Sequence, residues 1–143
     1  MTRISFYLLQ DAQPQARLLT ACRLAEKAYQ AGSQLYVHTA DDAQTQQLDQ
    51  LLWTFRQGSF IPHERADQDD ETSPILIGHA PQPPLRINDV LLNLAAEVPV
   101  FFSRFGRVLD VVGSQAGERE QARVRFRFYR DRGYELETHE LGA

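Results

Sequence analysis

Apolar, strand-like runs alternate with helix-like segments along most of the chain, and this order constrains the fold more than any other feature. Strands are expected at residues 4–9, 34–38, 74–77, 89–94, 108–112 and 134–138, and helices at residues 15–31, 41–53, 100–105 and 115–132. Strands joined through helices need crossover connections, which are right-handed and favour parallel pairing. The sequence therefore predicts an α/β fold with a mainly parallel sheet, whose last strand lies at an edge.

The stretch between the second helix and the third strand is less regular. Phe55–His63 contains Gly58 and Pro62, and we expect an ordered loop there. Ala66–Ser73 holds four acidic residues, so an exposed acidic loop is expected. Neither a repeat nor an interdomain linker interrupts the pattern, which predicts one domain over residues 1–143.

Composition and the N-terminus favour a cytoplasmic protein without a membrane segment. No apolar run approaches the roughly 20 residues that cross a bilayer. Met1–Phe6 leads directly into strand-like sequence, with no signal-peptide core. Cys22 is the one cysteine, and it shares a helical face with Leu18, Ala25 and Tyr29. We therefore expect Cys22 to be a small buried side chain, with neither a disulfide nor a cysteine-based zinc cluster.

The phosphate-binding loops of nucleotide-binding α/β proteins are missing from this sequence. The turn after the first strand, Gln10–Pro14, lacks the Gly-x-Gly-x-x-Gly pattern, and Lys27, the one lysine, lies in mid-helix. Gly113–Gly117 does join a strand to a helix N-terminus, where backbone amides can hold an anion. An ordinary tight turn explains the same residues, so two interpretations stay open.

The histidines and serines give no clear active site. His38 and His79 both follow strands, so they can meet at the carboxyl edge of the sheet, near Asp41 or Asp42, as a metal or acid–base pair. Solvated loop histidines are the simpler interpretation. The order Gly113-Ser114-Gln115 excludes a Gly-x-Ser-x-Gly nucleophile elbow. We accordingly expect a non-catalytic protein without a cofactor or metal.

Aromatic residues gather around the end of the second helix and the loop that follows it. Trp53, Phe55 and Phe60 lie close to Arg56, a composition typical of interface hot spots. Core packing is the alternative, and it suits Trp53, which continues the apolar face of Leu48 and Leu52. Phe60, in a loop bounded by glycine and proline, fits the core less well.

The last helix carries a stripe of arginines. Arg119, Arg123, Arg127 and Arg130 recur at helical spacing, beside an apolar stripe of Ala122, Phe126 and Tyr129 that is expected to face the sheet. Aligned like charges destabilise a helix, so the stripe favours an acidic partner. A solvated face paired with the chain's own carboxylates is the alternative. The net charge of −4 argues against broad nucleic-acid binding.

Three stretches of sequence resemble the chi subunit of bacterial DNA polymerase III. They are Phe6-Tyr7-Leu8-Leu9; Leu48-Asp49-x-x-Leu52-Trp53 followed by Ser59-Phe60-Ile61-Pro62-His63; and Ala122-Arg123-x-Arg125-Phe126-x-x-Tyr129-Arg130-x-x-Gly133-Tyr134. The resemblance implies a Rossmann-like, doubly wound, mainly parallel sheet with helices on both faces and no nucleotide-binding loop. It also implies an accessory subunit of the clamp-loader assembly, held through the psi subunit.

The resemblance further implies two binding surfaces. Chi proteins grip the acidic, Phe-terminated C-terminal tail of single-stranded DNA-binding protein, so the contact with DNA is indirect. The matching tail-binding positions are Arg123, Arg119 and Val112, with Arg127 further along the arginine stripe. The surface used by psi, and by a DNA helicase in some bacteria, maps onto Trp53 and Phe60.

Two further functions remain as alternatives at this point. One is a small nucleotide- or small-molecule-binding enzyme that uses the Gly113–Gly117 turn. The other is direct binding of single-stranded DNA by the arginine-rich last helix. Binding of DNA and of an acidic tail both weaken with salt, so salt dependence alone does not separate them.

Overall fold

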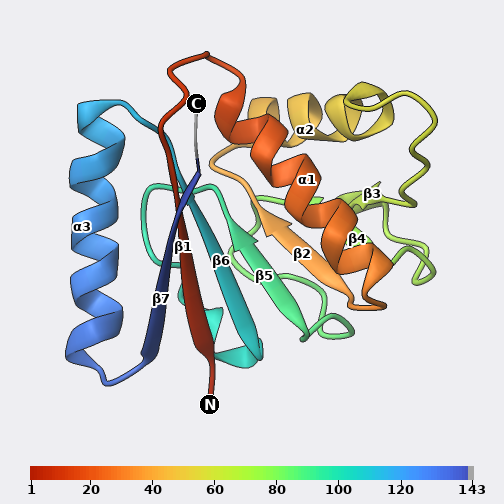
Figure 1. The fold of residues 1–143 in the computed structure, drawn as a ribbon. Coiled ribbons are helices and arrows are strands. Elements are labelled where there is room, and N and C mark those ends of the chain that lie inside the picture. Colours follow the sequence, from red (N-terminus) through yellow and green to blue (C-terminus); the bar gives the residue numbers. More distant parts are fainter. Residues whose placement is uncertain (142–143) are drawn as a thin grey trace.

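Seven strands form one sheet in the order β3-β4-β2-β5-β6-β1-β7 in the computed structural model, which describes residues 1–141 (Figure 1). The strands are β1 Arg3–Leu9, β2 Leu35–His38, β3 Glu64–Arg65, β4 Ile75–Gly78, β5 Val90–Asn93, β6 Arg107–Val112 and β7 Glu135–Leu141. The helices are α1 Ala16–Gln30, α2 Asp42–Thr54 and α3 Ala116–Asp131, with 3-10 turns η1 Ala66–Gln68 and η2 Phe102–Arg104. Neighbouring strands of the described chain pair in parallel throughout, which confirms the predicted doubly wound α/β fold.

Helices cover both faces of the sheet. On one face, Leu35 and Val37 of β2 pack in a cluster with Cys22 of α1 and Leu52 of α2. On the other, Tyr36 of β2 belongs to the cluster that α3 and η2 cover. Successive residues of a strand point to opposite faces, so one short apolar run supplies both cores. Figure 1 shows α1 crossing the sheet and α3 standing beside β7.

Strand β1 lies between the last two strands of the chain. Leu8 is in register with Val112 of β6 on one side and with Glu140 of β7 on the other. The first strand of the chain is therefore hydrogen-bonded on both sides to strands from the C-terminal part of the sequence. This arrangement brings β1, β6, β7 and α3 together at one end of the sheet (Figure 1).

The helix boundaries follow the expected signals. Asp41 caps α2, because its side chain accepts a hydrogen bond from the Gln44 backbone N–H at 2.9 Å. Gly133, with φ of 81°, follows α3 in the left-handed conformation that favours glycine. Cys22 and Ala25 are buried as predicted, but Tyr29 is 38% exposed. One turn before Tyr29, Glu26 is buried, and its carboxylate accepts a hydrogen bond from Ser59 Oγ at 2.7 Å.

The segment between α2 and β4 differs in part from expectation. Phe55–His63 is an ordered loop as predicted, and the short strand β3 that follows it was not predicted. The prediction of an exposed acidic loop is partly wrong. The Asp69 side chain is largely buried, and its carboxylate accepts a hydrogen bond from Arg86 Nη2 at 2.7 Å. Within residues 1–141, no helix has both the length and the apolarity to span a bilayer.

Candidate functional site

A cavity of about 260 Å³ lies between α3 and the β1–β7 edge of the sheet; we call it the α3 cavity. Its apolar lining consists of Phe6, Leu8, Val112, Ala122 and Phe126. Two guanidinium side chains and one hydroxyl complete it: Arg119, Arg123 and Thr138. The cavity thus combines an apolar floor with a cationic rim.

The floor of the α3 cavity follows from the strand and helix patterns. Phe6 and Leu8 alternate along β1, so both face α3. Phe126 meets the Phe6 ring edge to face, with 5.4 Å between ring centroids. Ala122 is buried in the middle of α3, where its small side chain leaves room above the sheet.

The two rim arginines are held in different ways. Arg119 Nη2 donates to the Leu9 backbone carbonyl at 2.6 Å, which ties α3 to the carboxyl end of β1. Arg123 Nη1 donates to Glu120 Oε2 at 2.8 Å, and both side chains are about two-thirds exposed, 68% and 64%. An exposed pair of this kind contributes little stability, so Arg123 is readily available to another carboxylate.

The structure brings three of the four predicted tail-binding residues together. Val112, Arg119 and Arg123 all line the α3 cavity, whereas Arg127 is exposed on the same helix and does not line it. Arg125, which the sequence analysis named only as part of a family stretch and gave no role, is almost fully buried. It lies three residues after Ala122 and four before Tyr129, which places it on the same buried face of α3. This spacing was the sequence signal that could have predicted its burial.

The Gly113–Gly117 turn is ill suited to phosphate. The Glu118 carboxylate packs so closely on Gly113 that a Cβ there would lie 1.6 Å from Glu118 Oε2. Arg17 lies across the carboxyl ends of β5 and β6, donating to the Leu94 carbonyl at 2.8 Å and the Val111 carbonyl at 3.0 Å. Ligands of open α/β sheets bind at this edge, and here the chain's own side chains occupy that part of it.

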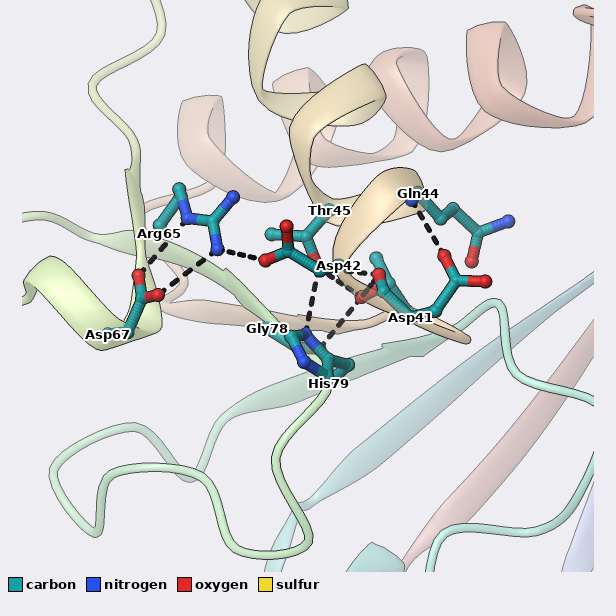
Figure 2. Close-up of polar contacts among 9 residues, drawn as sticks. Asp41, Asp42, Gln44, Thr45, Arg65, Asp67, Gly78 and His79 are labelled. Atoms are coloured by element: carbon teal, nitrogen blue, oxygen red, sulfur yellow. Dashed lines mark hydrogen bonds and ion pairs between the residues drawn. The ribbon is translucent and has the colours of Figure 1, made fainter.

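The histidine pair lies at the carboxyl ends of β2 and β4. Figure 2 shows His79 Nδ1 beside Thr45 Oγ1, 3.4 Å away, and Arg65 between Asp42 and Asp67. His38 is not a solvated loop residue: it packs edge-on against Phe101, and burial, helped by nearby His79, lowers its pKa to about 4. Residues 1–141 hold no group of three or more side chains suited to a metal ion.

The aromatic residues after α2 divide into core and surface. Phe55 is half-buried against the core, while Trp53 is 49% and Phe60 82% exposed. The indole of Trp53 lies on the His63 ring, with 4.1 Å between centroids. His63 is itself fixed by Nδ1–Ile61 carbonyl and Nε2–Asp49 carbonyl hydrogen bonds of 2.6 and 2.9 Å. Core packing is therefore the wrong interpretation for Trp53 and Phe60, each of which exposes a large apolar side chain.

A family model described as DNA polymerase III chi subunit, HolC, matches residues 1–137. The chain belongs to the chi subunit family of DNA polymerase III. Members of this family are subunits of the replicative polymerase assembly, so the protein takes part in DNA replication. The family implied by the three sequence stretches is confirmed.

Relatives in the chi family match over nearly their full lengths. The chain is 48% identical to DNA polymerase III subunit chi of Pseudomonas aeruginosa over 141 residues, 99% of this chain and 98% of the relative. It is 28% identical to the Haemophilus influenzae protein of that name, with 96% of each chain covered. The Escherichia coli protein is 27% identical, with 96% of this chain and 97% of the relative covered.

A solved structure outside the chi family shares the fold alone. The crystal structure of T4 UvsW superposes with a TM-score of 0.68 at 10% sequence identity, over 99% of this chain and 42% of that one. The chain thus matches less than half the length of that protein.

Proposed function

We propose that this chi-family protein is a non-catalytic accessory subunit that links the clamp loader, through psi, to the acidic C-terminal tail of single-stranded DNA-binding protein. The observation that carries the proposal is the α3 cavity, whose apolar floor lies directly beside Arg119 and Arg123. A tail that ends in phenylalanine presents an apolar ring and a carboxylate at the same residue, and the cavity offers a counterpart for each.

The chemistry of the cavity suits such a tail. A phenyl ring inserted beside Ala122 and Phe126 contacts apolar side chains on several sides, and removing the ring from water favours binding. Guanidinium groups bind carboxylates through paired, charge-assisted hydrogen bonds. Arg127, one helical turn beyond Arg123, is exposed and can meet an acidic residue further up the tail.

A second surface is proposed for psi, and for a DNA helicase where one binds chi. Trp53 and Phe60 are large apolar side chains that stay exposed in the isolated chain. Exposed aromatic side chains on a fixed scaffold are common anchors of protein interfaces. His63 supplies that scaffold, because its two backbone hydrogen bonds hold the ring on which Trp53 lies.

The tail proposal is tested by titrating a synthetic acidic peptide ending in Asp-Phe into the protein. We expect Arg123→Ala to weaken binding by about 1.5–3 kcal/mol, the scale of a hydrogen bond to a charged group. Arg130→Ala is the matched control, because this exposed arginine of the same helix does not line the cavity. Equal affinity for a peptide without its terminal Phe would contradict the apolar-pocket part of the proposal.

An oligonucleotide titration tests whether contact with DNA is indirect, as proposed. Single-stranded DNA should bind far more weakly than the tail peptide at the same salt concentration. Binding of the oligonucleotide that is tighter than that of the peptide, and lost in Arg123→Ala, would favour direct DNA binding by α3 instead.

The psi surface is tested with Phe60→Ala. We expect the variant to lose psi in a pull-down with purified proteins while keeping its stability, since an exposed side chain contributes little to folding. Val100→Ala, which removes another side chain that is 87% exposed, is the control. Retention of psi by Phe60→Ala would show that the partner docks elsewhere.

A further inference from the structure

A second cavity, of about 420 Å³, lies on the other face of the same strand pair; we call it the α1 cavity. Its aliphatic lining includes Leu9 of β1, Leu19 and Leu24 of α1, and Leu141 of β7. Two cationic side chains of α1, Arg23 and Lys27, also line it. The α1 cavity therefore repeats the combination seen in the α3 cavity, an apolar floor beside two basic groups.

The backbone of β1 explains how two similar cavities arise back to back. Successive strand residues point to opposite faces, so Leu8 lines the α3 cavity and Leu9 lines the α1 cavity. Each cavity has one long helix along its side. In both, the two basic side chains are four residues apart and lie one turn from each other on that helix.

The basic rim of the α1 cavity is free of internal counterions in the part of the chain described. Arg23 and Lys27 are exposed, and neither makes a hydrogen bond or ion pair with residues 1–141 through its side chain. The one acidic side chain of the lining, Asp11, makes no ion pair with either basic group among residues 1–141, and its Oδ1 accepts from the Gln13 backbone N–H at 2.9 Å. One carboxylate beside two cations leaves the lining net positive, which favours an external anion.

We propose that the α1 cavity is a second docking site for an acidic peptide segment that carries an apolar anchor residue. Charge complementarity selects the partner: carboxylates suit Arg23 and Lys27, and an apolar side chain suits the leucine floor. The inference rests on the proposed function for the class of ligand, and adds a site to it. A partner with more than one acidic tail can then occupy both faces of the β1–β7 pair.

The lining favours a peptide over single-stranded nucleic acid. Nucleic-acid sites that tolerate any sequence stack bases on exposed aromatic rings. Tyr7 is the one aromatic residue of this lining, and its ring is already stacked on His139 with 4.9 Å between centroids. The remaining apolar contacts are aliphatic, which suits a side chain of a peptide.

Two sites on one chain change the binding of a partner with several tails. Once one tail is bound, a second tail on the same partner stays at high local concentration, so overall affinity rises without new contacts. The sheet separates the two cavities, so one short peptide does not fill both. Each site is therefore occupied by a separate tail.

The test uses ¹⁵N-labelled protein and a spin-labelled acidic peptide ending in Asp-Phe. We expect paramagnetic broadening at Leu24 and Lys27 beside the α1 cavity, and separately at Ala122 and Arg123 beside the α3 cavity. The double variant Arg23→Gln/Lys27→Gln should lose the first set of broadened amides and weaken that site by roughly tenfold or more. It should leave the second set unchanged.

A matched control changes the net charge of the protein by the same amount at another place. Gln46→Glu/Gln50→Glu adds two negative charges to exposed positions of α2, and should leave the broadening at Leu24 intact. Equal loss in this control would overturn the proposal by showing a general charge effect. So would saturating peptide that broadens Ala122 but never Leu24, or broadening at Leu24 by a spin-labelled oligonucleotide but not by the peptide.

The two proposals fail in distinguishable ways. Arg123→Ala should remove broadening at Ala122 and preserve it at Leu24, which would support an independent second site. Broadening at Leu24 alone in the unmodified protein would contradict the α3 cavity as the tail site and still support the α1 cavity.

Discussion

Arg125 forms a buried bidentate ion pair with Asp110: its Nε and Nη2 donate to the two carboxylate oxygens at 2.9 and 3.0 Å. The side chains are 4% and 0% exposed. Arg125 Nη1 also donates to the Ala96 carbonyl at 2.7 Å. One side chain therefore fixes α3 to β6 and to the loop after β5, and so sets where Ala122 and Arg123 stand over the α3 cavity.

Arg125→Ala should destabilise the protein by about 3–5 kcal/mol, because it leaves the Asp110 carboxylate buried without its counterion. Urea unfolding followed by circular dichroism measures the change. Arg127→Ala, on the exposed side of the same helix, should change the free energy of unfolding by no more than about 0.5 kcal/mol. A loss below about 1 kcal/mol for Arg125→Ala would mean that Asp110 finds another partner or a proton.

Arg127→Ala should weaken binding of the tail peptide less than Arg123→Ala does. Arg127 lies outside the α3 cavity, so it can add only a solvent-exposed ion pair, worth about 0.2–1 kcal/mol. Isothermal titration at low and high salt measures this contribution, which should fade as salt rises. An effect of Arg127→Ala equal to that of Arg123→Ala would place the tail further along α3.

His38 should make the protein less stable in mild acid. Burial lowers its folded-state pKa to about 4, whereas the unfolded chain takes up a proton near pH 6.5. The unfolded state therefore binds more protons between these values, and stability is lost as the pH falls through this window. From pH 7 to pH 5 the loss is at most about 2 kcal/mol, because partial exposure of the ring to solvent screens the effect.

Urea unfolding at the two pH values, for the protein and for His38→Gln, measures this contribution. The variant should lose less stability between pH 7 and pH 5 than the unmodified protein, because glutamine does not titrate. His139→Gln is the control, since His139 is exposed at the edge strand. Identical pH dependence in all three proteins would contradict a buried, neutral His38.

Cys22 should resist thiol reagents until the protein unfolds. The side chain is fully buried, and burial raises the pKa of the thiol from 9.0 to about 12. At pH 8 the thiolate, which is the reactive form, is then roughly a thousandfold rarer than in a free cysteine. Labelling with a chromogenic disulfide reagent should follow global unfolding in urea, and rapid labelling of the folded protein would show local opening of α1.

The sequence was informative about the fold because most elements carry their own signals. The strands of the core are short runs of apolar residues, and Asp41 and Gly133 mark helix ends as their chemistry requires. Strand β3 has only two residues and no apolar pattern, so the sequence did not predict it. It is a strand because Glu64 and Arg65 pair with β4. The burial of Glu26 in α1 was not readable from the sequence, because its partner Ser59 lies 33 residues further along.

The candidate site was only partly readable from the sequence. Spacing on one helix identified Arg119 and Arg123, and family resemblance supplied Val112. Thr138 and Phe6 of the same cavity were missed, because they meet only when β7 pairs with β1 in the observed register. The α1 cavity was missed for the same reason: Leu141 joins α1 through that pairing.

The place of β1 in the sheet has a consequence for the synthesis of the protein. β1 leaves the ribosome well before β6 and β7, so Leu8 gains its strand neighbours Val112 and Glu140 only after those strands have been synthesised. Contacts so distant in sequence form late and slowly. Both cavities are built on β1 and β7, so an unfinished chain presents neither of them. Only a chain that has been translated through β7 can be recognised by its partners there.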